Sequence, residues 1–258
     1  MVEPITSLQN AKVKLAHSLQ NRARSRRKER KIVLEGTRLV GDAFEQGHHA
    51  DFYFYESASV DYELFAKLQN GSAPLIPVND EIMKHVSDTQ TPQGIIGVYP
   101  LPTPSLRPHP SRVLILDGVS EPGNMGTILR SAGASGVEVV ILAPKCVDPY
   151  NPKVLRAGMG AHFRIPLIEA TWQEIRAYCE DMNLYAAAGD GDVVYSDVDW
   201  TARWALIIGN EAHGIGDTAE DLAQRIRIPM AQASESINAA VATGVILFEA
   251  QRQHLAKK

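Results

Sequence analysis

The chain has 258 residues, of which 45% are hydrophobic and 22% charged, as in an ordinary globular protein of one large or two small domains. Its net charge of −4 excludes a basic field over the whole surface. The only cysteines, Cys146 and Cys179, are too far apart for a C-x-x-C site, which excludes a disulfide framework and zinc-binding cysteines. No stretch resembles a signal peptide or a membrane span, so we expect a cytoplasmic protein.

The charge is distributed unevenly along the chain. Between residues 12 and 38 there are many lysines and arginines, and the only acidic residues are Glu29 and Glu35. Such a block on a mildly acidic protein predicts a local anionic partner, although a solvated helix face is the alternative interpretation of the same charges. If the partner is RNA, the residues expected to contact its phosphates are Arg22, Arg24, Arg26, Arg27, Lys28, Arg30 and Arg38.

The first half alternates between helical and strand patterns. A capped amphipathic helix follows Asn10, and the basic run after it is predicted to be the helix end and a loop. Strands are expected at 32–36, 51–55, 76–78 and 93–99, with helices at 37–46, 62–69 and 80–86. We therefore predict a small α/β domain over residues 1–99. Its tyrosines Tyr53 and Tyr55 are expected to pack in a strand rather than stack on bases.

Prolines recur through residues 100–111, and alternate prolines favour an extended, semi-rigid spacer. We place the domain boundary in this segment. The second half, residues 112–258, then restarts with near-continuous apolar runs, the pattern of buried parallel strands. Strands are predicted at 112–117, 137–142, 163–168, 184–187, 204–209 and 225–230, and helices at 127–135, 153–156, 171–182 and from about 238. The last helix carries Val241, Val245 and Phe248 on one face, which we expect to be buried.

Three loops of this half follow predicted elements and carry small and polar residues. The first contains Asn124 and leads to Arg130, a pair suited to clamp a phosphate or ribose, although Arg130 also fits a plain surface position. Its glycine spacing does not match a dinucleotide fingerprint. The second contains Gly209 and Glu211. Both this loop and the third, which runs from Ile228 to Asn238, follow buried strands, and ligands of open α/β sheets bind at that edge. In the third loop, Ser234 or Ser236 as a simple helix cap is the alternative.

In this order, the segments Asn124…Arg130, Gly209-Asn210-Glu211…Gly214 and Ile228-Pro229-Met230…Ser236-Ile237-Asn238 resemble the three motifs of the SpoU/TrmH-type RNA ribose 2′-O-methyltransferases of the SPOUT superfamily. The likeness covers the whole second half. The front of the chain, through Leu34-Glu35-Gly36 and Arg38, is similar to that family's substrate-binding domain. Ribosomal RNA branches of the family share this two-domain layout.

The resemblance implies a trefoil-knotted α/β catalytic domain with a parallel sheet, a smaller N-terminal α/β RNA-binding domain, and a homodimer. It implies S-adenosylmethionine as cofactor. No metal ligands are apparent in the sequence, so we expect no metal. By motif position, Gly209, Ile228, Met230 and Ile237 would contact the cofactor. The reaction centre would contain Asn124, Arg130, Glu211, Ser236 and Asn238.

One position departs from the family pattern, because Ala240 stands where a serine is usual. The expected activity is methyl transfer to a ribose 2′-hydroxyl, with ribosomal RNA as the favoured substrate. The same chemistry on transfer RNA is one alternative. A non-catalytic RNA-binding or ribosome-assembly protein on the same scaffold is another, which the Ala240 departure leaves open.

Overall fold

The computed structural model describes residues 4–103, 106, 108–231 and 236–257 and divides into two compact units. Unit 1 contains Met1–Pro102 together with Tyr150–Gly160, and unit 2 contains Thr103–Pro149 together with Ala161–Lys258. The change of unit after Pro102 falls within the proline-rich segment. The chain then returns to unit 1 over Tyr150–Gly160, here called the 150–160 excursion, which the sequence patterns do not predict.

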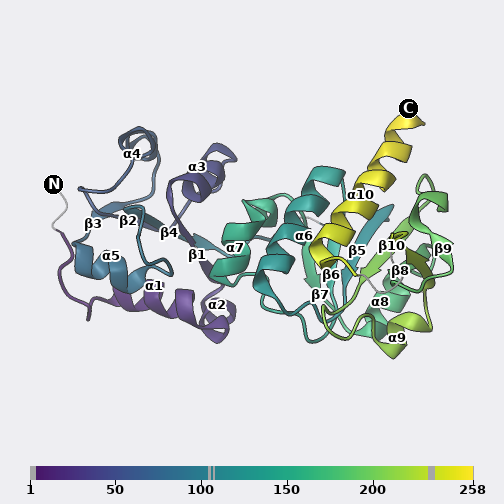
Figure 1. Ribbon diagram of the computed structural model, residues 1–258. Helices are drawn as coiled ribbons and strands as arrows, with labels where there is room; N and C mark the ends of the chain where they lie inside the picture. Colours follow the sequence, from purple (N-terminus) through teal and green to yellow (C-terminus); the bar gives the residue numbers. More distant parts are fainter. Residues whose placement is uncertain (1–3, 104–105, 107, 232–235, 258) are drawn as a thin grey trace. The chain divides into compact units, whose positions relative to one another are not determined.

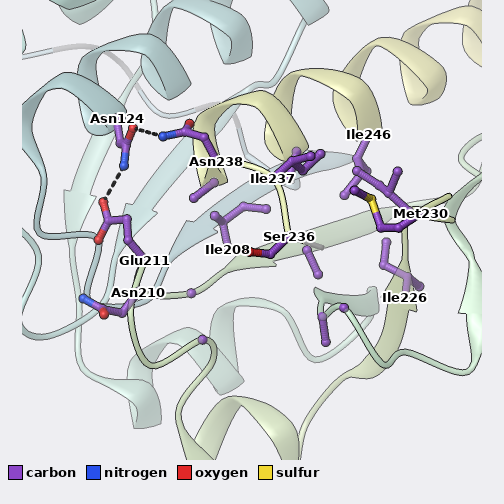
Figure 2. Close-up of a pocket in the computed structure, with 18 residues that line it drawn as sticks. Asn124, Ile208, Asn210, Glu211, Ile226, Met230, Ser236, Ile237, Asn238 and Ile246 are labelled. Atoms are coloured by element: carbon purple, nitrogen blue, oxygen red, sulfur yellow. Dashed lines mark hydrogen bonds between the residues drawn. The ribbon is translucent and has the colours of Figure 1, made fainter. Parts of the chain in front are cut away.

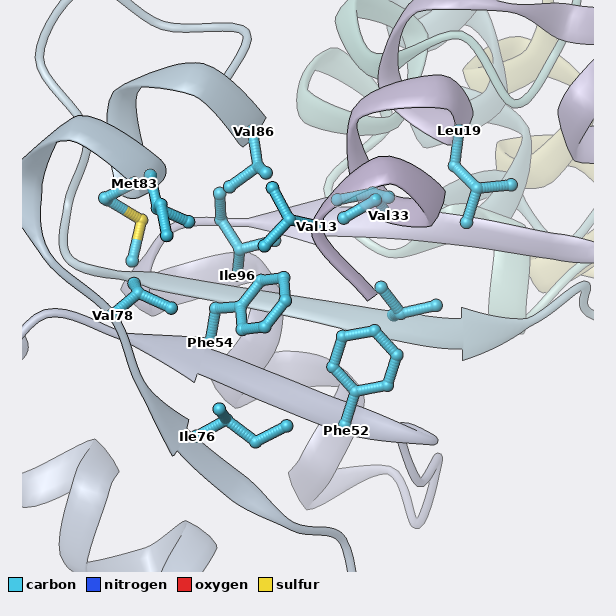
Figure 3. Packing of buried hydrophobic residues seen from close by; sticks show 13 residues of the cluster. Val13, Leu19, Val33, Phe52, Phe54, Ile76, Val78, Met83, Val86 and Ile96 are labelled. Carbon is cyan, nitrogen blue, oxygen red and sulfur yellow. The ribbon is translucent and has the colours of Figure 1, made fainter. Parts of the chain in front are cut away.

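Unit 1 is built on a mixed four-stranded sheet. Strand β4 (Ile95–Pro100) lies antiparallel between β1 (Lys31–Glu35) and β2 (Phe52–Tyr55), and β3 (Leu75–Pro77) pairs parallel with β2. Helices α1 (Ala11–Asn21) and α5 (Asp80–Val86) pack a dry core against this sheet (Figure 3). The helices α3 (Thr37–Glu45) and α4 (Tyr62–Gln69) complete the unit. Tyr53 is 1% exposed, so it belongs to the core, as its strand pattern predicts.

The basic run after α1 is a helix, α2 (Ala23–Glu29), and not the loop predicted from its charges. It ends at Arg30, whose φ of 53° lies in the left-handed region. Arg26 is only 4% exposed, and its Nη1 donates hydrogen bonds to the carbonyl oxygens of Leu19 (2.5 Å) and Gln20 (3.2 Å). Both carbonyls lie in the last turn of α1, where helical partners run out. Arg26 therefore stabilises a helix end, and its place among the expected RNA contacts is corrected.

Unit 2 contains a seven-stranded sheet in the order β7-β6-β5-β10-β8-β11-β9, with every pairing parallel. The strands are β5 (Arg112–Leu116), β6 (Val139–Leu142), β7 (Leu167–Glu169), β8 (Asn183–Ala187), β9 (Val193–Val194), β10 (Trp204–Ile208) and β11 (Gln224–Arg227). This sheet confirms the parallel α/β class expected from the apolar runs. The strand predicted at 163–168 is instead the short helix η1 (Ala161–Phe163) followed by β7.

Helices cover the two faces of this sheet differently. Helices α8 (Trp172–Tyr178) and α9 (Asp217–Glu220) pack against alternate residues of β5, β6 and β10. Helices α6 (Pro122–Ser135) and α10 (Ala239–Ala256) pack against each other (Figure 1). The sequence predicts that the side of α10 that carries Val241, Val245 and Phe248 is buried. This expectation is wrong for the single chain, in which these side chains are 54%, 37% and 51% exposed. Within the described residues, no helix is long and apolar enough to cross a membrane.

Both helices that flank the loops begin differently from the prediction. Helix α6 starts at Pro122 rather than near Thr127, because proline is well tolerated at the first helical position, where no N–H partner is needed. Asn124 therefore lies in the first turn of α6. The N-cap of α10 is Asn238, whose Oδ1 accepts hydrogen bonds from the amides of Ala240 and Val241. Ser236 is not that cap, and Ser234 lies outside the described residues.

The 150–160 excursion carries α7 (Pro152–Gly158), which contacts β1 of unit 1. Asn151 caps its start, and Met159 and Gly160 turn the chain back with φ values of 45° and 74°. At the base of the excursion, in unit 2, the fully buried His162 lies 2.8 Å from the carbonyl oxygen of Pro149 through Nε2. Burial lowers the pKa of His162 from 6.5 to about 4, against the opposing effects of the Pro149 hydrogen bond and the charge of Asp148.

This buried histidine predicts a pH-dependent stability. Because its folded pKa is depressed, the unfolded chain takes up the proton first as the pH falls below 6.5, and the loss of stability ends near pH 4. We expect His162 to contribute a decrease of about 3 kcal/mol in unfolding free energy across this window. The variant His162→Gln keeps a donor for Pro149 without titrating. Denaturant unfolding between pH 4 and 7 should therefore give a shallower pH slope for the variant, and parallel curves would contradict the assignment.

Candidate active site

The loops singled out from the sequence meet at the carboxyl edge of the parallel sheet of unit 2. A cavity of about 430 Å³ opens there, between the ends of β8, β10 and β11 and the start of α10 (Figure 2). This volume is in the range of small-molecule and cofactor sites. Its walls are polar at one end and apolar at the other (Figure 2). The expected site residues that line it are Asn124, Gly209, Glu211, Ile228, Met230, Ser236, Ile237 and Asn238.

The polar end is organised by the carboxylate of Glu211. One oxygen, Oε1, accepts from the amide of Glu121 (3.2 Å) and from Nδ2 of Asn124 (3.0 Å). The other, Oε2, accepts from the backbone N–H (3.2 Å) and Oγ (3.1 Å) of Ser120. Glu211 thereby holds the residues that lead into α6. Burial raises the pKa of Glu211, but hydrogen bonds from Asn124 and from nearby backbone amides outweigh it and leave the pKa below its ordinary value.

A directed chain of amides continues from this carboxylate. Because an ionised carboxylate can only accept, Asn124 turns its NH₂ group to Glu211 and its Oδ1 away. That Oδ1 accepts from Nδ2 of Asn238 at 2.8 Å, and Oδ1 of Asn238 accepts from the first amides of α10. All three loops are therefore joined by hydrogen bonds with one fixed sense (Figure 2). Through Asn124 and Asn238, Glu211 therefore fixes the start of α6 relative to the start of α10.

Residues 209–214 form a tight loop that displays Glu211. Asn210 and Gly214 exchange two backbone hydrogen bonds, of 2.7 and 2.9 Å, and Gly214 has a φ of 71°. Nδ2 of Asn210 donates to the carbonyl oxygen of Gly118 at 2.8 Å, which ties this loop to the one before α6. A Cβ on Gly209 would lie 2.2 Å from the carbonyl oxygen of Gly214. Only glycine fits at 209, because the loop passes directly over it.

The apolar end was only partly predicted from the sequence. Among its residues, Ile228, Met230 and Ile237 belong to the recognised motifs. The wall also contains residues that the sequence reasoning missed: Ala187, Ala188, Gly189, Ile208, Ile226, Ala242 and Ile246. Ala187 ends a parallel strand, β8, so the rule that places ligands at the carboxyl edge would have indicated the loop after it.

Two expected features lie outside the cavity wall. Arg130 is exposed on α6, beyond the residues that line the cavity. Ala240 is 4% exposed and is likewise absent from the lining. In the part of the chain that the structure describes, no group of three His, Cys, Asp or Glu side chains is placed to hold a metal ion.

A parallel α/β sheet with a cofactor-sized cavity at its carboxyl edge is typical of a ligand-binding α/β domain. Residues 111–248 match the SpoU rRNA methylase family, and residues 10–97 match the MRM3-like substrate binding domain. The chain belongs to the SpoU rRNA methylase family. It is 35% identical to the mitochondrial rRNA methyltransferase 3 of Mus musculus, over 88% of this chain and 69% of that protein.

Bacterial relatives match almost end to end. The 23S rRNA (guanosine(2553)-2′-O)-methyltransferase RlmP of Bacillus subtilis is 29% identical, over 96% of this chain and 98% of its own. The AdoMet-bound rRNA methyltransferase of Sinorhizobium meliloti superposes with a TM-score of 0.83 at 30% identity, covering 97% of this chain and 98% of that one. These likenesses extend over both units.

The clash at Gly209 gives a direct test of the cavity. We expect Gly209→Ala to weaken S-adenosylmethionine binding by about tenfold or more, or about 1.4 kcal/mol, because the added methyl displaces the loop that carries Glu211. The matched control is Gly244→Ala in α10, where the nearest atom to an added Cβ is 3.8 Å away. Calorimetric titration measures the affinities, and thermal melting confirms that both variants fold. Equal affinity for wild type and Gly209→Ala would contradict the arrangement.

Proposed function

We propose that the chain transfers a methyl group from S-adenosylmethionine to a ribose 2′-hydroxyl of ribosomal RNA. The observation that carries the proposal is the cavity whose polar end joins all three motif loops through Glu211, Asn124 and Asn238. Family membership and relatives named as rRNA methyltransferases support it. When bound, the cofactor supplies an activated methyl group on a sulfonium, and the protein supplies position and electrostatics.

The cavity wall fits such a cofactor. Its apolar end would take the adenine ring and the methionine chain, with Ile228, Met230 and Ile237 as side walls. Gly209 leaves backbone groups open to close approach. The polar end adds amide and hydroxyl groups from Asn124, Ser236 and Asn238, which suit hydrogen bonds to a ribose or a carboxylate. We propose these residues as the cofactor and substrate contacts.

Glu211 serves as an anchor rather than as a proton acceptor. Its two oxygens already accept hydrogen bonds from three residues, and these bonds hold its pKa below the ordinary value. A general base for a sugar hydroxyl needs a higher proton affinity. The proposed role of Glu211 is to fix Asn124, and through it Asn238, so that their amides are aligned before substrate binds.

Arg130 is proposed to stabilise the negative charge that develops on the 2′-oxygen as this hydroxyl attacks the methyl group, and to orient a neighbouring phosphate. A guanidinium is always protonated in proteins, so it acts as a charge and donor rather than as a base. Its exposed position outside the cavity wall of its own chain supports a site completed by a second copy.

The exposed stripe of α10 supports a homodimer. Val241, Val245 and Phe248 follow helical spacing on one side of α10, and large apolar side chains in such a stripe normally have a partner. The stripe lies on the same helix whose N-cap, Asn238, lines the cavity. A partner covering α10 would therefore lie next to the proposed reaction centre.

We propose that the exposed cations of unit 1 contact RNA phosphates. These cations are Arg22, Arg24, Arg27, Lys28, Arg30 and Arg38. The bacterial relatives support a cytoplasmic location. A knotted path is part of the proposal through the family resemblance; the connection from β11 to α10 includes residues 232–235, outside the described residues.

The function is tested by incubating the protein with ribosomal RNA and S-adenosylmethionine carrying a labelled methyl group, and by mapping 2′-O-methylated nucleotides. We expect Arg130→Ala to lower methylation by about 10²-fold or more, because the positive charge that stabilises the transition state is lost, while cofactor affinity stays unchanged. The matched control is Arg176→Ala, which removes an exposed arginine of α8. Loss of cofactor binding in folded Arg130→Ala would refute its role, and wild type without activity on ribosomal RNA would refute the function.

The dimer is tested by placing charges on α10. We expect the double variant Val245→Glu with Phe248→Glu to run at the mass of one chain instead of two in sedimentation velocity, because buried unpaired carboxylates oppose association. Methylation should fall with it. Tyr62→Glu, which alters an 84% exposed apolar residue of α4, is the control. An unchanged mass of the double variant, or a wild type with the mass of one chain, would exclude this interface.

A further inference from the structure

We propose that residues 87–93 of unit 1, here called the 87–93 loop, form a rigid RNA-reading edge that recognises unpaired nucleotides through polar contacts. The inference rests on the proposed function and goes beyond it, because it assigns sequence recognition to a loop outside the basic run. The supporting observations are a buried carboxylate under the loop, anchors at both of its ends, and an exposed polar tip, with a cationic residue next in sequence to one anchoring contact.

The first anchor is Glu35, at the end of β1, which is only 7% exposed. Its Oε2 accepts from the amide of Asp88 at 2.9 Å and from Nε2 of Gln20 at 3.2 Å. Its Oε1 accepts from the hydroxyl of Thr89 at 2.6 Å and from that of Ser87. Burying a carboxylate is costly unless such bonds are made. The start of the loop is therefore fastened to the sheet.

Two further contacts fix the loop elsewhere. Oε1 of Gln93 accepts from the amide of Thr37 at 3.0 Å, so the end of the loop also holds the first turn of α3. Nη2 of Arg156, in α7 of the 150–160 excursion, donates to the carboxylate of Asp88 at 2.8 Å. The loop is thus held by β1, α3 and α7, all within unit 1.

The tip between these anchors is free to meet a ligand. Gln90 and Thr91 are exposed, and Pro92 restricts the backbone between Thr91 and the Gln93 anchor. Gln93 is also exposed. Because its Oε1 accepts from Thr37, its Nε2 is the side-chain group that can donate to a ligand. Arg38 is exposed and directly follows Thr37 in the chain, so a cationic residue is next in sequence to the residue that Gln93 contacts. Both nearby carboxylates, Glu35 and Asp88, are already engaged.

This chemistry fits RNA better than another macromolecule. Amide and hydroxyl groups hydrogen-bond base edges and 2′-hydroxyls, whereas cations contact phosphates without reading sequence. A tip that combines both, with a cationic residue next in sequence to one anchoring contact, matches a single-stranded or loop segment of RNA. Because the loop is ordered by its anchors before binding, little further ordering is needed when the ligand arrives. The basic run of α2 then supplies affinity, and the 87–93 loop supplies discrimination.

The division of roles is tested with full-length protein and two probes, bacterial large-subunit ribosomal RNA and poly(U). The double variant Gln90→Ala with Thr91→Ala changes only exposed tip residues. We expect it to weaken binding to ribosomal RNA by about tenfold or more while poly(U) affinity and the salt dependence of binding stay at wild-type values. Arg27→Ala should do the reverse: it should weaken both probes together and make the salt dependence less steep.

The matched control is Gln69→Ala with Thr6→Ala, which removes the same side chains from exposed positions elsewhere in unit 1. It should bind both probes as wild type does. A tip variant with the wild-type preference for ribosomal RNA, or one that loses both probes equally, would overturn the inference while leaving methylation by the wild type intact. A wild type that neither methylates ribosomal RNA nor prefers it to poly(U) would overturn the proposed function and this inference with it.

Discussion

The polar end of the cavity depends on the ionised carboxylate of Glu211. Because it can only accept hydrogen bonds, it sets the orientation of Asn124, and Asn124 sets that of Asn238. A glutamine at 211 would bring its NH₂ group toward the donors of Ser120, Glu121 or Asn124, and the hydrogen bonds between the amides would lose their single direction. One charge thus aligns Asn124 with Glu211, 87 residues further along the chain, and with Asn238, 114 residues further along. The alignment of these side chains is a property of the fold.

The parallel sheet and most of the cavity wall could be predicted from the sequence. Continuous apolar runs indicate buried parallel strands, and the loops that follow such strands lie at one edge of the sheet. The sequence therefore predicts that Glu211, Ile228 and Asn238 lie close together. The start of α6 could not be read in the same way, because Pro122 looks like an interruption until it occupies the first helical position. Arg26 was misassigned because charge patterns do not reveal a guanidinium that bonds backbone carbonyls inside the fold. Short-range patterns also carry no information about the 150–160 excursion, whose fold partner is β1.

Two features of α10 bear on how the family pattern varies in this chain. Ala240 is buried in the first turn and does not line the cavity. The stripe of Val241, Val245 and Phe248 is exposed, although the opposite side of the helix packs on α6. The helix is therefore apolar on two sides, one that packs on α6 and one that is exposed. A periodicity analysis cannot separate them, because both sides raise the hydrophobicity of the same segment.

The 150–160 excursion belongs to unit 1, although the segments on either side of it belong to unit 2. A substrate unit cut at the proline-rich segment would leave α7 behind, with Arg156 parted from Asp88 and without β1 to pack on. Swapping recognition modules between relatives, in the laboratory or in evolution, must therefore move α7 together with the first hundred residues or redesign their shared surface. A cut in the proline-rich segment alone therefore does not separate the residues of unit 1 from those of unit 2.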